Sequence, residues 1–431
     1  MLKLKGSITI SGDKSISHRA LIFASLSTGK VIISNLLESD DVMRTLYILR
    51  ELGIKIVKKK DKWLVWGNGT GGYIQPSQAL DCGNSGTTSR LMIGAVSSNP
   101  INCTFIGDNS LSKRSMSRIS VFLEKMGAKI KLTKKDFLPL YIKGNSNLIP
   151  MKHEMNKPSA QVKSALILSA LNLQGKTSII EKRNTRDHTE KLMSYLKIKY
   201  KKIKLKNKST LIEVDGPCEI KPKNITVASD PSSAAFFIVG ALILPGSNIV
   251  LKNVAINKTR IAFIQILKKM GGKISIKRTK KVSGEEIGEI KVSYSMLKSI
   301  KINSSLSAFL IDEYPILSIA ASQAKGTTIM TGLSELRYKE SDRIKSIVKN
   351  LSKLGFNVKS KNDNIVIKGS KNLKIEKQKK INTYDDHRIA MSFTILSLLY
   401  ESKLIIDNES CISISYPDFN KHLKKLSNTC K

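Results

Sequence analysis

Six short polar motifs in the sequence carry residue types that could bind an anion together. Each combines Ser, Asp or Asn with the start of an apolar stretch. These residues commonly cap helix N-termini, where free N–H groups and a partial positive charge attract anions. A single copy would be an ordinary helix cap, but six in register favour a polyanion site. The motifs are Asp13–Ser15, Gly83–Gly86, Lys157–Gln161, Asp230–Ser233, Ile311–Pro315 and Tyr384–Arg388.

The arginines point to the same kind of ligand. Only 13 of the 73 basic residues are Arg, and seven lie in or near these motif-rich segments. Arg is the better bidentate partner for carboxylate and phosphate. One such Arg would more often form a surface ion pair, whereas seven predict a ligand with several anionic groups. They are Arg19, Arg90, Arg114, Arg186, Arg337, Arg343 and Arg388.

A repeated set of elements must position these motifs. Anchored on Ser15, Ser85, Ser159, Ser232, Asp312 and Asp386, the intervals are 70, 74, 73, 80 and 74 residues. Between the motifs lies an amphipathic helix that ends at Gly and continues into a strand, because Gly accepts the left-handed C-cap conformation. Lys197 takes this place in the third copy, which predicts a different helix end there. One repeat reads strand, helix, strand, helix, strand, strand.

Length and composition indicate a globular enzyme. At 431 residues with 41% hydrophobic content, two domains are expected. The apolar runs 234–244 and 389–400 are too short and interrupted to span a bilayer, and the N-terminus leads directly into a strand pattern rather than a signal peptide. The five cysteines have no CxxC spacing. They argue against a zinc site or disulfide framework and favour a cytoplasmic location.

The formal charge of +39 could indicate a nucleic-acid-binding protein. Its distribution favours another interpretation, because the dense Lys runs fall in the predicted strand pairs, away from the motifs. They also lack interleaved aromatic residues for base stacking. We interpret them as solvated faces. The runs are Lys58–Lys60, Lys199–Lys208, Lys277–Lys281 and Lys374–Lys380.

The ordered set of motifs resembles one family, the 5-enolpyruvylshikimate-3-phosphate synthases (3-phosphoshikimate 1-carboxyvinyltransferases). The resemblance runs from Gly12 to about Pro417, and the Gly-Asn-Ser-Gly-Thr-Thr and Lys-Glu-Ser-Asp-Arg blocks are its most specific parts. The matching segments are Gly12–Ala20, Gly83–Leu91, Gly107–Arg114, Arg186–Lys191, Asp312–Pro315, Glu335–Arg343 and Asp386–Met391.

The resemblance implies an α/β fold of two similar domains. Each would contain three βαβαββ-like units with helices inside and sheets outside, as an inverted α/β barrel. One domain would comprise residues 14–228 and the other residues 1–13 plus 229–431, with the active site in the cleft between them. Helices inside such domains would be apolar nearly all round, as 165–173 and 236–244 are.

The implied reaction transfers the enolpyruvyl group of phosphoenolpyruvate to the 5-hydroxyl of shikimate 3-phosphate without a metal or organic cofactor. By the resemblance, Asp312 is the base at the hydroxyl, Glu340 is the proton shuttle at the methylene carbon, and Lys14 contacts phosphate on both substrates. Arg90 and His387 would support the site from behind. The remaining shikimate 3-phosphate ligands would be Ser15, Arg19, Ser159, Ala160, Gln161, Arg186 and Lys339, with Asp312 also touching this substrate. The phosphoenolpyruvate ligands would be Asn84, Gly86, Arg114, Gln161, Arg343 and Arg388.

One departure and two alternatives accompany this interpretation. Some family members carry a Lys where this chain has Ile414, so a phosphate contact expected there is missing or supplied by another Lys. The sister enzyme acting on UDP-N-acetylglucosamine normally has a mobile-loop cysteine, whereas 107–116 has none. The other alternative is a basic nucleic-acid-binding repeat protein, whose binding would weaken steeply with salt. We expect a monomer that acts on the two small molecules, without nucleic-acid or membrane partners.

Overall fold

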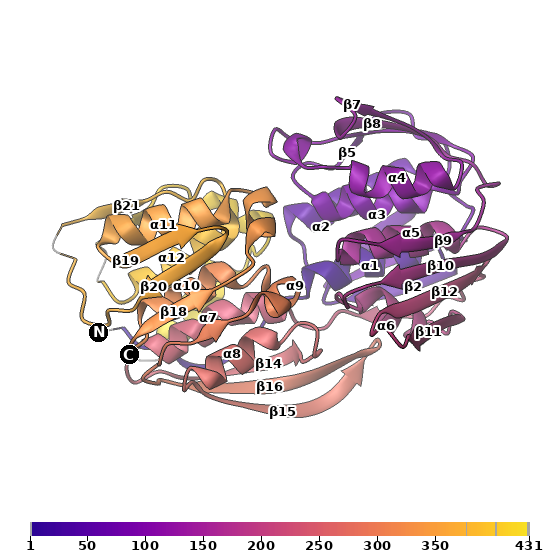
Figure 1. Ribbon diagram of the computed structural model, residues 1–431. Coiled ribbons are helices and arrows are strands. Elements are labelled where there is room, and N and C mark those ends of the chain that lie inside the picture. The colour runs from indigo at the N-terminus through magenta and orange to yellow at the C-terminus, as the bar shows by residue number, and fades with distance from the viewer. Residues whose placement is uncertain (1, 376, 401–402, 429–431) are drawn as a thin grey trace. The chain divides into compact units, whose positions relative to one another are not determined.

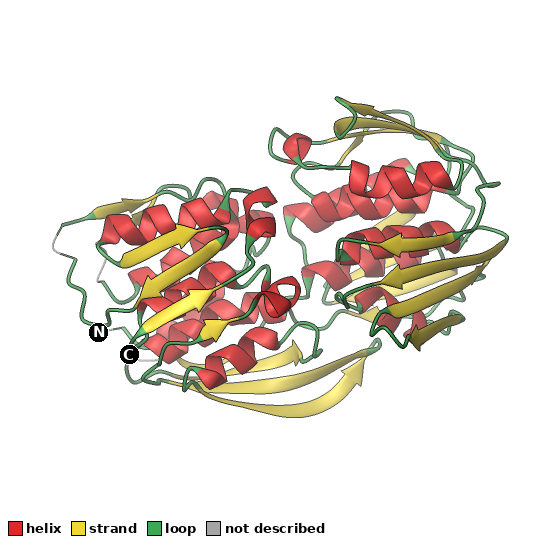
Figure 2. Cartoon of the chain, in the orientation of Figure 1, coloured by secondary structure: helices red, strands yellow, loops and turns green. Residues whose placement is uncertain are grey.

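The computed structural model describes residues 2–375, 377–400 and 403–428, and these form two compact units. We call Lys14–Val227 with Val282–Glu285 the N-terminal unit. Met1–Asp13, Ala228–Lys281 and Glu286–Lys431 form the C-terminal unit. The chain therefore passes between the units after Asp13 and after Val227, and the tip of one hairpin (282–285) joins the N-terminal unit. The fold is mixed α/β, with several small sheets and many helices (Figures 1 and 2).

The N-terminal unit contains three four-stranded sheets and two helices for each sheet. The sheet orders are β13-β2-β4-β3, β5-β6-β8-β7 and β9-β10-β12-β11. The strands are β2 Thr28–Ser34, β3 Lys55–Lys59, β4 Lys62–Asn68, β5 Leu80–Asp81, β6 Asn102–Ile106, β7 Lys129–Thr133, β8 Phe137–Lys143, β9 Lys152–Met155, β10 Gly175–Glu181, β11 Tyr200–Lys204, β12 Thr210–Gly216 and β13 Ile225–Thr226. The helices are α1 Lys14–Ser25, α2 Asp40–Glu51, α3 Gly86–Ser97, α4 Ser117–Lys125, α5 Ala160–Ala170 and α6 His188–Tyr195.

The C-terminal unit repeats this plan with a shorter last copy. Its sheet orders are β1-β14-β16-β15, β17-β18-β20-β19 and β21-β22. The strands are β1 Lys5–Thr9, β14 Asn248–Ala255, β15 Lys273–Val282, β16 Glu285–Ser293, β17 Lys301–Ile302, β18 Thr327–Met330, β19 Asn357–Lys361, β20 Asn364–Lys368, β21 Lys379–Ile381 and β22 Leu404–Ile406. The helices are α7 Pro231–Ile243, α8 Ala262–Lys269, α9 Ser307–Leu310, α10 Tyr314–Ser322, α11 Arg343–Leu354, α12 His387–Ser397 and α13 Phe419–Asn428.

Two strands pair outside their own copy of the repeat, at the points where the chain passes from one unit to the other. We call them the exchanged strands. In the unexchanged four-stranded sheets, the first strand of a copy pairs in parallel with the second, as β5 does with β6. By contrast, β1 from the first copy pairs with β14, and β13 from the fourth copy pairs with β2. This exchange makes the C-terminal unit discontinuous in sequence.

The first helix of each copy is buried, because it is apolar on nearly every side. All 13 residues of α7 are buried, and this helix packs against α10 and α12. In the N-terminal unit α3 packs against both α1 and α5. No helix in the described ranges combines the length and apolarity needed to cross a membrane.

The third repeat corrects one expectation about helix ends. Gly53, Gly127, Gly271 and Gly355 follow their helices with φ values of 85–101°. Lys197 was expected to require a different ending, but it adopts the same left-handed conformation at φ 61°. The Ile198 N–H then bonds the Met193 carbonyl, just as the Ile54 N–H bonds Leu49. The expectation was wrong because the hydrogen bonds of the helix end hold a non-Gly residue in the left-handed region.

Candidate active site

In the N-terminal unit, three helix N-termini that carry predicted site residues lie close together. The side chains of Ser85 and Ser159 cap α3 and α5. Gln161, in the first turn of α5, donates to the hydroxyl of Thr87 in the first turn of α3 at 2.9 Å. Arg19, in the second turn of α1, donates to Ser164 of α5 at 2.7 Å. The positive ends of three helices therefore converge, as anion binding requires.

Lys14 is the first residue of α1 and carries the ammonium group of this cluster. Its Nζ lies 2.8 Å from Oδ2 of Asp41, and both side chains are mostly buried, with 16% and 12% exposure. Asp41 lies in the first turn of α2. Sequence analysis missed this partner, because an acidic residue in a first helical turn looks like an ordinary complement to the helix dipole. The ion pair fixes the position of the Lys14 ammonium group.

Arg114 and Arg90 have different surroundings, although both follow predicted anion-binding motifs. Arg114 Nη2 donates to Asn84 Oδ1 at 2.7 Å and to Ser110 at 2.9 Å, so two predicted phosphoenolpyruvate ligands lie together. Arg90 donates instead to Gln161 Oε1 at 2.9 Å and to the Ser115 carbonyl at 3.1 Å. This contact orients the Gln161 side chain, which fits a supporting position for Arg90.

Arg19 is buried, and each of its three guanidinium nitrogens donates to a protein group. Besides Ser164, it donates to Thr189 Oγ1 at 2.7 Å and to the Ser15 carbonyl at 2.9 Å. The guanidinium therefore ties α1 to α5 and α6, next to Ser15 and Ser159. Its contact with a substrate stays a prediction.

Arg186 lies in the loop between β10 and α6, and a buried ion cluster braces that loop. Lys163 Nζ contacts Glu181 Oε2 at 3.1 Å and Glu190 Oε1 at 2.7 Å, on either side of the loop. Thr185, next to Arg186, donates to the other oxygen of Glu181. All three charged side chains are at most 2% exposed. Nothing in the sequence indicates this ion cluster, since Lys163 lies within an apolar helix.

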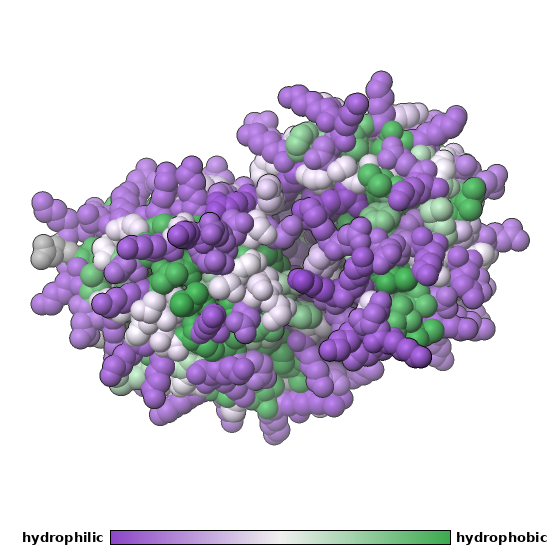
Figure 3. Space-filling view, viewed as in Figure 1, coloured by the Kyte–Doolittle hydropathy of each residue, from purple (hydrophilic) through white to green (hydrophobic). Residues whose placement is uncertain are grey.

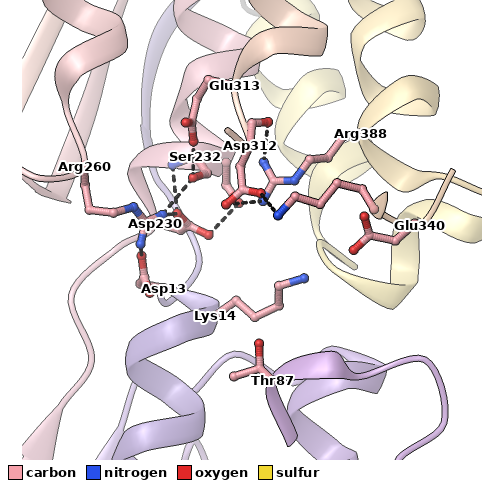
Figure 4. Close-up of polar contacts among 12 residues, drawn as sticks. Asp13, Lys14, Thr87, Asp230, Ser232, Arg260, Asp312, Glu313, Glu340 and Arg388 are labelled. Carbon is pink, nitrogen blue, oxygen red and sulfur yellow. Dashed lines mark hydrogen bonds and ion pairs between the residues drawn. The ribbon is translucent and has the colours of Figure 1, made fainter. Parts of the chain in front are cut away.

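In the C-terminal unit the starts of α7, α10 and α12 also meet (Figure 4). Asp230 and Asp386 cap α7 and α12 with their side chains. Ser232 of α7 donates to Glu313, at the N-cap of α10, at 2.5 Å. Arg388 of α12 donates to the Asp312 carbonyl at 3.1 Å. His387, the first residue of α12, is buried beside this cluster.

Asp312 is placed to act as a carboxylate in a positive environment. Lys339 Nζ, Arg343 Nη1 and Arg388 Nη2 lie 3.7–4.0 Å from its two oxygens, and its side chain is 17% exposed. It does not cap α10, because the N-cap residue of that helix is Glu313, which lies between Asp312 and Tyr314. The arrangement favours a chemical role over the helix-cap alternative.

Arg343 connects the carboxylates of the fifth and sixth motifs. Its Nη2 lies 2.6 Å from Glu340 Oε2, and its Nε lies 2.8 Å from Asp386 Oδ2. Burial alone would lower the pKa of Arg343, but Asp386, Glu340 and Asp312 raise it above its ordinary value. Burial likewise opposes ionisation of Asp386, whose pKa is nevertheless lowered by Arg343. Asp386 is thus a fixed counter-ion, and sequence analysis identified it only as a helix cap.

Ile414 ends a short 3₁₀ helix, Ser410–Ile414, and packs against the hydrophobic core of the C-terminal unit. A side chain in that position contributes apolar packing instead of a phosphate contact. Among the residues that the structure describes, no three His, Cys, Asp or Glu side chains are grouped as metal ligands.

Comparison with known proteins places this geometry in one family. A family model described as EPSP synthase (3-phosphoshikimate 1-carboxyvinyltransferase) matches residues 1–423. The chain is 42% identical to the 3-phosphoshikimate 1-carboxyvinyltransferase of Zymomonas mobilis, over 98% of this chain and 94% of the relative. It is 43% identical to the Streptococcus uberis protein of the same name, over 98% and 97%.

Solved structures agree with the sequence relatives. EPSP synthase from Acinetobacter baumannii matches with a TM-score of 0.86 at 36% identity, covering 99% of this chain and 96% of the other. The enolpyruvyl transferase NikO from Streptomyces tendae matches with a TM-score of 0.76 at 14% identity, over 99% and 95%. The second match shows only that the fold is shared.

Proposed function

Because the chain belongs to the EPSP synthase family, we propose that it transfers the enolpyruvyl group of phosphoenolpyruvate to the 5-hydroxyl of shikimate 3-phosphate and releases phosphate. The observation that carries this proposal is the position of Asp312 among three cations. A base for a hydroxyl and positive charge for phosphate and carboxylate groups are both present there.

In the proposed reaction, Asp312 takes the proton of the hydroxyl as its oxygen attacks C2 of phosphoenolpyruvate. Glu340 gives a proton to the methylene carbon, so that a tetrahedral intermediate forms. Glu340 then removes a proton from the new methyl group, while the bond from C2 to the phosphate oxygen breaks and phosphate leaves with the proton that Asp312 took from the hydroxyl. The carboxylate of phosphoenolpyruvate would compete with Glu340 for Arg343, which releases Glu340 for proton transfer.

The positive side chains bind and orient the two substrates in this proposal. Lys14, Ser15, Arg19, Ser159, Ala160, Gln161 and Arg186 of the N-terminal unit, with Lys339 and Asp312 of the C-terminal unit, hold shikimate 3-phosphate. Asn84, Gly86, Arg114, Gln161, Arg343 and Arg388, together with Lys14, hold phosphoenolpyruvate. The fixed charges of these side chains would lower the barrier by stabilising the developing anion.

Several finer features belong to the same proposal. Each unit would be an inverted α/β barrel, with domains at 14–228 and at 1–13 plus 229–431. The buried first helices and the recurring sheet order support this description. We also propose a cytoplasmic monomer that needs no cofactor. Cys82, Cys103, Cys218 and Cys411 are free thiols, which fits a reducing compartment.

A phosphate-release assay tests the proposal and its nearest alternative together. Purified protein is given phosphoenolpyruvate with either shikimate 3-phosphate or UDP-N-acetylglucosamine. We expect release with shikimate 3-phosphate alone. Release only with the nucleotide sugar would assign the sister activity, and no release with either would reject enolpyruvyl transfer.

Gly86 gives a prediction about inhibition by glyphosate, which occupies the phosphoenolpyruvate pocket in this family. A Cβ at residue 86 would lie 2.7 Å from Arg90 Nη1 and 3.5 Å from Arg114 Nη1. We expect glyphosate to compete with phosphoenolpyruvate and to bind more tightly once shikimate 3-phosphate is present. Gly86→Ala should weaken glyphosate about tenfold or more, and phosphoenolpyruvate less, because the longer ligand meets the new methyl group.

Steady-state inhibition constants for wild type and Gly86→Ala measure this difference. Gly94→Ala is unsuitable as a control, because its Cβ would meet the Ala165 backbone at 2.4–2.7 Å. Gly71→Ala is a milder control, because residue 71 is not among the left-handed glycines and its Cβ would lie 3.2 Å from the nearest atom, Oδ1 of the Asn172 side chain. Equal glyphosate constants in wild type and Gly86→Ala would show that residue 86 does not line the pocket.

The Lys-rich surface gives a prediction of little change. Lys58, Lys59 and Lys60 are exposed at the β3–β4 turn, and Lys58 forms an exposed ion pair with Glu38. Figure 3 shows that hydrophilic residues cover much of the visible face. Exposed pairs contribute little, so replacing all three by alanine should leave kcat/KM within about twofold. A large loss of activity with unchanged thermal stability would reveal a role for this surface.

A further inference from the structure

One buried arginine in the C-terminal unit is connected, directly or through one serine, to residues that flank two predicted site residues (Figure 4). Arg260 is 2% exposed. Its Nη1 lies 2.7 Å from Asp13 Oδ2, and its Nη2 lies 2.9 Å from Asp230 Oδ1. Nη2 also donates to Ser232 Oγ at 2.7 Å. Ser232 in turn donates to Glu313 at 2.5 Å, so one guanidinium begins a continuous buried network.

The two segments in which the chain passes from one unit to the other run side by side next to Arg260. The Asp13 N–H donates to the Ala228 carbonyl at 2.8 Å, and the Asp230 N–H donates to the Ser11 carbonyl at 3.0 Å. Asp13 and Asp230 therefore stand on paired segments, and Arg260 joins their carboxylates. The guanidinium is planar and its N–H donors point in fixed directions, so it sets both the distance between the two carboxylates and their orientation. An ammonium group cannot do this.

The composition of this network suggests geometry rather than stability as its purpose. Three buried carboxylates, Asp13, Asp230 and Glu313, lie near one guanidinium, and all are at most 5% exposed. Burial, followed by the Asp13 charge, raises the pKa of Asp230. Buried ion pairs rarely stabilise a fold more than apolar packing would. Burying these charged groups is therefore costly, and a role in holding their geometry explains why the network is built this way.

The two ends of the network lie next to predicted site residues. Asp13 immediately precedes Lys14, and Glu313 immediately follows Asp312. The peptide linking each pair is planar, so a shift of one residue moves its neighbour. We propose that Arg260 is a positioning residue, which holds Lys14 through Asp13 and Asp312 through Ser232 and Glu313. This inference rests on the proposed function.

The test separates positioning from loss of folded protein by comparing KM with kcat. Arg260→Lys keeps the charge but loses the planar fork. We expect KM for both substrates to rise fivefold or more, through Lys14, and kcat to fall tenfold or more, through Asp312. Asp13→Asn should raise both KM values with a smaller change in kcat. The combined variant should show less than the product of the two single effects on KM, because both act along one path.

Phe263→Leu is the matched control, because Phe263 is a fully buried core residue in the helix that follows Arg260. It should lower the melting temperature without changing either KM. If Arg260→Lys behaves like this control, the positioning role is wrong. If Arg260→Lys does not fold, Asp13→Asn decides, since unchanged KM values there would also overturn the inference. An inactive wild type would instead reject the proposed function.

Discussion

Replacing Lys14 by alanine is expected to nearly abolish binding of both phosphorylated substrates. The ammonium group is held 2.8 Å from Asp41 at the start of α1, where the helix N-terminus adds to its positive field. A charge-assisted hydrogen bond contributes roughly 1.5–3 kcal/mol, and its loss would also leave Asp41 facing the substrate phosphate. We therefore expect kcat/KM to fall about 10²-fold or more, measured by phosphate release.

Lys58→Ala is the control for this experiment, since Lys58 also forms a lysine–carboxylate pair, 2.6 Å from Glu38, but at 44% exposure. It should leave kcat/KM unchanged. Titration calorimetry with shikimate 3-phosphate alone separates binding from turnover. Wild-type affinity in Lys14→Ala would remove Lys14 from the phosphate site.

Replacing either Asp312 or Glu340 by alanine is expected to reduce turnover by about 10²-fold or more, the usual scale for general acid–base groups. The two variants should differ in one respect, because only Glu340 is placed at the methylene carbon in our proposal. Glu340→Ala should slow deuterium exchange into the methylene group of phosphoenolpyruvate. Arg343 keeps Asp386 as a partner in this variant, so the fold should be retained.

Asp363→Ala controls for simple loss of an ion-paired carboxylate, because Asp363 pairs with Arg337 on the surface. It should retain nearly full activity. Circular dichroism and melting temperature would establish that the variants are folded. Near-normal turnover in both Asp312→Ala and Glu340→Ala would overturn the assignment of the two roles.

The sequence predicts the local parts of this protein better than its long-range pairs. Ser85, Ser159, Asp230 and Asp386 cap their helices as their motifs indicate, because a cap depends on residues two or three positions away. The Lys197 helix end was missed, since residue type alone does not show how tightly the surrounding hydrogen bonds hold the backbone.

The partners of the charged site residues could not be predicted in the same way. Asp41 is 27 residues from Lys14, and Arg260 is 247 residues from Asp13. The first pair joins the two helices of one copy and the second joins two copies, and one sequence does not reveal packing of either kind. The pairing of β1 with β14 was hidden for the same reason, because the repeat pattern alone favours pairing within each copy.

The exchanged strands constrain the order in which the sheets can form while the chain is being synthesised. β1 is synthesised long before its partner β14, which begins at Asn248. The sheet of β2 gains its last strand earlier, when β13 emerges at Ile225. Residues 5–9 therefore stay unpaired until β14 has been synthesised, and such long-range closure slows folding. We expect a purified chain truncated near residue 240 to protect 14–227 from protease while residues 2–13 stay accessible.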